Sequence, residues 1–114
     1  MHIAELLKKI AMENVIFSKH AAEILEERKL SNEFIIEKLF DLESLKAEAK
    51  QNGTTILIYS HTSKYHIVIV VSAENNSIKI VTAFKSSKRI EKLLKSAKAI
   101  ISYSKIIPSG ENNR

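Results

Sequence analysis

Two histidines, an arginine and a threonine are the residues of this sequence whose types suit a chemical reaction. His20 and Arg28 lie in VIFSKHAAEILEER, His66 opens the run HIVIVV, and Thr82 lies in IVTAFK. Imidazole takes and gives protons near neutral pH, and guanidinium binds phosphate oxygens through two donors. Cleavage of RNA through its own 2′-hydroxyl needs a base, an acid and a cation for the phosphate charge. The four residues therefore suggest metal-free phosphoryl transfer.

The hypothesis gives each of these residues a role. His20 is the general base or acid, His66 is its partner, Arg28 holds the phosphate, and Thr82 orients it. Each residue also has a structural alternative, such as a histidine in the first turn of a helix or an arginine paired with a glutamate. The residues expected to contact the RNA around this centre are Lys64, Tyr65, Lys85, Lys88, Arg89 and Lys92.

Several other kinds of site find no support in the sequence. The chain has no cysteine, which excludes a disulfide framework and a cysteine-based zinc site. It contains no H-E-x-x-H motif, no Walker loop and no G-x-G-x-x-G. Its acidic residues are scattered, which argues against a two-metal or glycosidase site. We therefore expect neither a metal nor a cofactor.

Charge is distributed unevenly along the chain. Residues 1–43 carry a net charge of −3, whereas residues 44–114 carry a net charge of +8. The densest part is residues 79–98, with seven basic residues against one acidic residue. A basic half on a small domain favours a polyanionic partner such as nucleic acid. A solvated, lysine-rich helix face would give the same pattern.

The first part of the chain has the spacing of helices. Apolar residues recur at helical spacing in three segments, and Ser18 and Ser31 stand where the second and third helices need an N-cap. A brief extended segment, residues 15–17, precedes the second helix. The three predicted helices span residues 2–12, 19–29 and about 32–41.

The rest of the chain has mostly the pattern of strands. Asn52-Gly53 is a strong hairpin signal between two of them. Ser86-Ser87 precedes a helical pattern with lysines on its outer side, which predicts a basic helix over residues 88–98. The expected class is α+β, with N-terminal helices on a three- to four-stranded antiparallel meander and a C-terminal helix. The predicted strands span residues 45–51, 54–60, 65–73 and 77–84.

Length and hydropathy predict one domain over residues 1–114 of a soluble, cytoplasmic protein. The chain start lacks a signal-peptide pattern, and the apolar run IVIVV is too short to cross a bilayer. Residues 109–114 are polar and are expected to form a loose tail. The apolar segment AIISYSKIIP, residues 99–108, either extends the last helix or mediates a homodimer or the capture of a partner segment.

The order of the motifs resembles a known family. The stretch SKHA…EERKLS at residues 18–31, YHIVIV at residues 65–70 and IVTAF at residues 80–84 are similar to motifs of the RelE/BrnT-like toxins. The resemblance covers residues 13–98 and is closest to a small branch with a histidine–alanine pair and a glutamate–arginine pair. It implies the barnase/EndoU/colicin/RelE-like fold, with N-terminal helices on an antiparallel sheet and an RNA-cleaving site on the sheet face.

The same resemblance implies which residues act and with whom. The family's functional positions fall on His20, Arg28, His66 and Thr82, whereas Ala21 replaces the glycine of BrnT-like members. The implied function is a metal-independent endoribonuclease toxin of a toxin–antitoxin system, with RNA and a cognate antitoxin protein as partners. Because activity is less constant than fold, a non-catalytic RNA-binding or partner-binding domain is the alternative.

Overall fold

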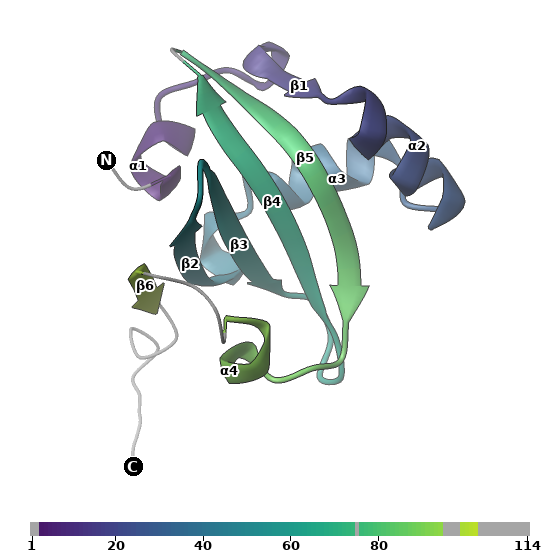
Figure 1. Ribbon diagram of the computed structural model, residues 1–114, viewed down its shortest axis with the longest axis vertical. Coiled ribbons are helices and arrows are strands. Elements are labelled where there is room, and N and C mark those ends of the chain that lie inside the picture. Colours follow the sequence, from purple (N-terminus) through teal and green to yellow (C-terminus); the bar gives the residue numbers. More distant parts are fainter. Residues whose placement is uncertain (1–2, 75, 95–98, 103–114) are drawn as a thin grey trace.

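The protein folds into one mixed β-sheet with helices on both faces (Figure 1). The computed structural model describes residues 3–74, 76–94 and 99–102. The strand order is β1-β5-β4-β3-β2-β6. The predicted α+β class is confirmed, but the sheet has more strands than predicted and includes one parallel pair.

Four consecutive antiparallel strands form the centre of the sheet. Gly53 has a φ of 73°, a left-handed conformation that glycine adopts at no steric cost, and with Asn52 it forms the predicted two-residue connection between β2 and β3. The next two turns, after β3 and after β4, keep the strands in sequential order. This part of the predicted meander is present. Its strands are β2 (Leu45–Gln51), β3 (Thr54–Ser60), β4 (His66–Glu74) and β5 (Ser77–Ser86).

Two further strands border this meander. The short strand β1 (Val15–Phe17), predicted only as an extended segment, runs parallel to β5 with Phe17 opposite Ile80. Strand β6 (Ala99–Ser102) pairs antiparallel with β2. The predicted extension of the last helix into residues 99–108 is therefore wrong for 99–102. Residues 103–108 and the predicted loose tail, 109–114, lie outside the described residues.

The N-terminal helices follow their predicted positions but are shorter. Side-chain oxygens of Ser18 and Ser31 accept backbone N–H groups at 3.0 Å and begin α2 and α3, as the N-cap pattern predicts. The first predicted helix ends early, and a 3₁₀ turn at Met12–Asn14 leads into β1. The helices are α1 (Ile3–Leu7), α2 (Lys19–Glu27) and α3 (Asn32–Leu39).

The last predicted helix is largely absent from the described residues. Helix α4 spans only Ile90–Leu93, and its N-cap is Arg89 rather than the predicted serine pair. Ser86 belongs to β5 instead, and its hydroxyl accepts the backbone N–H of Lys88. Residues 95–98 lie outside the described part of the chain.

Alternating strand residues build a separate core on each face of the sheet. Leu57, Ile69 and Ile80 lie on the face that α1, α2 and α3 cover. Val68 and Ile58 lie on the other face, against α4. This assignment decides which strand residues can share a site with a helix.

Candidate nucleic-acid interface

His20 lies in the first turn of α2 and is exposed. The buried side of that helix is formed by Ala21 and Leu25, which pack on the face covered by α1–α3. Arg28 follows at the other end of the helix, about 12 Å further along its axis at 1.5 Å per residue. His20 therefore lies apart from the predicted phosphate holder.

Arg28 reaches the edge of β5 from the C-cap of α2. Because pairing with β1 ends at Ile80, the following part of β5 has a free edge among the described residues. One guanidinium nitrogen, Nη1, donates to the backbone oxygen of Ala83 at 2.6 Å and lies 3.4 Å from the Thr82 hydroxyl. The guanidinium carbon lies 5.6 Å from the centre of the Phe84 ring. The structure thus brings together the predicted pair Arg28 and Thr82.

His66 is the first residue of β4, whereas Thr82 lies opposite the middle of that strand. His66 lies between Ser60 of β3 and Ser86 of β5, whereas Thr82 is opposite Val70. His66 and Val70 are four positions apart in β4, so His66 and Thr82 are separated by about 13 Å along the strand direction. Among the described residues, the buried Nδ1 atom of His66 has no hydrogen-bond partner.

The two histidines belong to opposite sides of the sheet. His66 alternates with Ile67, so it points to the same side as Val68, toward the core beneath α4. His20 is carried by a helix that packs on the other side. The sheet therefore separates the predicted acid–base pair, and the structure does not bring His20, His66 and Arg28 into one site.

A second cation–aromatic group lies close to the first. Tyr65 is half-buried just before β4, and the Nζ atoms of Lys64 and Lys85 lie 5.9 and 4.9 Å from its ring centre. Lys85 also lines the same hollow as Arg28. A cation over an aromatic face is favourable by about 0.5–1 kcal/mol at exposed sites. The pairs at Tyr65 and at Phe84 are thus parts of one surface.

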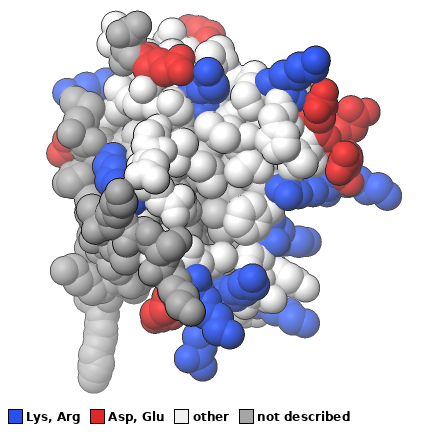
Figure 2. All heavy atoms as spheres, viewed as in Figure 1, with Lys and Arg blue, Asp and Glu red and all other residues white. Residues whose placement is uncertain are grey.

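We call this surface the basic surface, and it consists of four cations and two aromatic rings: Arg28, Lys29, Lys64 and Lys85 with the rings of Tyr65 and Phe84. Within the described part of the chain, none of its cations lies within 4 Å of a carboxylate oxygen. In the space-filling view (Figure 2), basic side chains gather near the end of β5 and around α4, whereas acidic ones cluster over α2, at the right of the view.

The predicted cations of the C-terminal segment extend this surface. Lys88, Arg89 and Lys92 are all exposed, on the turn after β5 and on α4. The turn begins directly after Ser86, so these three residues follow in the chain from the end of β5 that carries Lys85. The predicted RNA-contacting residues therefore lie near one end of the molecule, although not on a long helix.

Lys29 and Phe84 belong to this surface but were not among the predicted residues. Lys29 follows the C-cap of α2 with a φ of 58°, a position where glycine is usual. In the sequence, Lys29 could have been noticed because EERKLS has a lysine where the end of a helix usually has a glycine. The signal for Phe84 was an aromatic residue beside Lys85 near a strand end.

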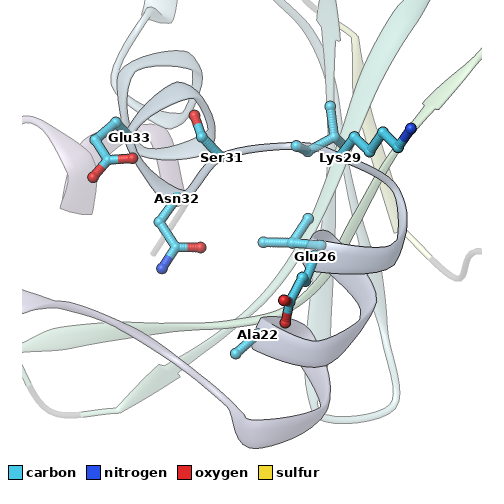
Figure 3. Close-up of a pocket in the computed structure, with 8 residues that line it drawn as sticks. Ala22, Glu26, Lys29, Ser31, Asn32 and Glu33 are labelled. Carbon is cyan, nitrogen blue, oxygen red and sulfur yellow. The ribbon is translucent and has the colours of Figure 1, made fainter.

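Two hollows flank the C-terminal end of α2. The one between α2 and α3 is lined by polar groups from Glu26, Ser31, Asn32 and Glu33, and Figure 3 shows the side chain of Lys29 pointing away from them. The other lies against β5 and is lined by Arg28, Lys29, Leu30, Phe84 and Lys85. Among the described residues there is no group of three or more potential metal ligands. Nor does that part contain a helix long and apolar enough to span a membrane.

Comparisons with known proteins give no identity. No protein-family model matches the chain, and neither the curated proteins nor the solved structures include a match. The resemblance to RelE/BrnT-like toxins therefore stays a prediction.

Proposed function

We propose that the protein binds RNA through the basic surface, as a non-catalytic binding domain. The observation that carries this proposal is the gathering of four cations, unpaired with carboxylates in the described chain, beside two aromatic rings. Unneutralised lysine and arginine side chains attract a phosphate backbone. Aromatic rings beside them add surfaces on which bases stack.

The positions of the histidines favour binding over catalysis. His20 and His66 lie on opposite sides of the sheet, whereas acid–base cleavage needs both groups at one phosphate. Binding requires only that the cations and rings share a surface, and this they do. The proposal therefore rests on the part of the predicted site that the structure brings together.

Salt dependence provides the test. We expect the logarithm of the association constant for a short single-stranded RNA to fall linearly with the logarithm of salt concentration, with a slope of about −3. The reason is that each neutralised phosphate contributes about −0.7 for a single strand, and the basic surface has four cations. Fluorescence anisotropy at several salt concentrations measures the slope. Equal binding of an uncharged peptide nucleic acid of the same sequence would contradict the proposal.

An endoribonuclease toxin, neutralised by a protein antitoxin, is the second candidate. The observation that favours it is the 3.4 Å approach of Arg28 Nη1 to the Thr82 hydroxyl, since both residues were predicted for phosphate contact. Guanidinium has five N–H donors, and donors not used on β5 can bind a phosphate oxygen. In this candidate a histidine acts with these two residues.

Expression in bacteria separates the two candidates. If the protein cleaves RNA, the wild type slows growth and degrades total RNA, whereas the His20→Ala and His66→Ala variants identify which histidine is required. The binding proposal predicts intact RNA in all three cultures. Growth is followed by optical density and RNA by gel electrophoresis. Intact RNA and equal growth with the wild type would remove the support for the toxin candidate.

A further inference from the structure

The hollow beside β5 combines an apolar interior with a cationic rim. It has a volume of about 610 Å³, within the range of roughly 300–1,000 Å³ that is usual for small-ligand sites. Leu30 and Phe84 supply its apolar part, and Arg28, Lys29 and Lys85 supply the charges. A single nucleotide has two parts that would complement these, a flat base with apolar faces and a negatively charged phosphate.

The apolar part suits the face of a base. Arg28 lies over the Phe84 ring at 5.6 Å, which places a planar guanidinium and an aromatic ring in one hollow. Unpaired bases stack on both kinds of surface. In a duplex the base faces are covered by neighbouring base pairs, so a duplex could offer this hollow only its backbone. The hollow is therefore suited to a single strand.

Lys29 provides an independent observation. The backbone N–H of Lys29 donates a hydrogen bond to the backbone oxygen of Glu26 at 3.1 Å. The backbone N–H of Leu30 donates one to the backbone oxygen of Leu25 at 3.0 Å. These bonds form a Schellman motif, in which the left-handed residue is usually glycine because other residues are strained there. Lys29 has no hydrogen bond or ion pair from its side chain among the described residues. The chain thus keeps a strained lysine at the rim of the hollow.

We infer that this hollow receives one unpaired base of a bound strand, with Lys29 and Lys85 holding the neighbouring phosphates. The inference rests on the proposed RNA binding and adds that the protein selects single-stranded over double-stranded nucleic acid. The charges give attraction to any polyanion, and the hollow gives the preference for an exposed base. The strain at Lys29 is consistent with a lysine retained for its charge rather than for its backbone.

Abasic oligonucleotides provide the decisive probe, because they keep every phosphate and lack the bases. We expect the wild-type protein to bind a short single strand about tenfold or more tightly than the abasic strand of the same length, as stacking of one base allows. A duplex of equal charge should bind like the abasic strand or more weakly. Fluorescence anisotropy at one low salt concentration measures all three. Equal binding of abasic and natural strands overturns the inference but leaves RNA binding intact, whereas failure of both to bind overturns both proposals.

Variants then locate the base. Phe84→Leu keeps apolar bulk and should reduce the natural-to-abasic ratio to near one. An unchanged ratio in Phe84→Leu overturns the assignment of the base to this hollow. Lys29→Gly should raise the midpoint of thermal unfolding and weaken binding of both strands several-fold. Unchanged affinity in Lys29→Gly would overturn the role of this lysine. Thermal unfolding of each variant confirms that it is folded.

Discussion

Replacement of Glu48 by alanine is expected to lower the free energy of unfolding by about 3 kcal/mol, because it removes a buried carboxylate that accepts a backbone N–H and leaves a cavity in its place. The Glu48 side chain is fully buried in β2, and its Oε2 accepts the backbone N–H of Ile3 at 2.6 Å. The same oxygen lies 3.4 Å from the Nζ of Lys50. Loss of the carboxylate leaves the first N–H of α1 without this acceptor and opens a cavity beneath the helix.

Two variants serve as controls for this prediction. Glu48→Gln keeps the size of the side chain and an acceptor for Ile3, so it should cost less than the alanine variant. Glu74→Ala removes an ion pair of similar length, 3.2 Å to Lys79, but both side chains are substantially exposed. Exposed pairs contribute about 0–1 kcal/mol, so this variant should be nearly neutral. Urea unfolding compares the three, and a Glu48→Ala effect no larger than that of Glu74→Ala would contradict the buried role.

Local signals predicted the elements whose causes are local. Ser18 and Ser31 begin α2 and α3 because a hydroxyl can satisfy a free N–H of the first turn. Asn52-Gly53 makes a hairpin because glycine tolerates positive φ. In each of these cases the residues that decide the structure are neighbours in the sequence.

Two of the errors concern strands whose partners are distant in the sequence. Residues 99–102 are mostly apolar and suit either a helix or a strand, and pairing with the outer edge of β2 decides between them. The three residues of β1 are too few for a periodic pattern, and their parallel pairing with β5 joins segments about sixty residues apart. Such pairing depends on the assembled sheet and not on local propensity.

The candidate site divides in the same way. Arg28 follows Ala21 and Leu25 at helical spacing, and from the C-cap of α2 its side chain reaches the edge of β5. His20 precedes Ala21 and is exposed instead. Which face of the sheet the helices cover is not encoded in strand alternation, so the sequence could not show that His66 lies on the opposite side. The prediction grouped His20 and His66 by their chemical type alone, and the sheet separates them.

Reversal of two charges on the basic surface should have the largest effect on binding. In the double variant Lys29→Glu/Lys85→Glu we expect affinity for a short single-stranded RNA to fall at least 100-fold at low salt, since two phosphate contacts become repulsive. The slope of the logarithm of affinity against the logarithm of salt concentration should change from about −3 to about −1.4, because two of the four phosphate contacts are lost. Both side chains are exposed and form no ion pair among the described residues. The free energy of unfolding should therefore fall by no more than about 1 kcal/mol, from loss of the contact between Lys85 and the Tyr65 ring.

A matched control reverses the same number of charges elsewhere. Lys8 and Lys9 are exposed just after α1, which lies across the sheet from the end of β5 in Figure 1. Lys8→Glu/Lys9→Glu gives the same net charge as the first double variant, so non-specific attraction to the whole molecule would weaken equally in both. If RNA binds at the basic surface, only Lys29→Glu/Lys85→Glu loses most of its affinity. Equal losses in the two variants would show that net charge, rather than this surface, accounts for the binding.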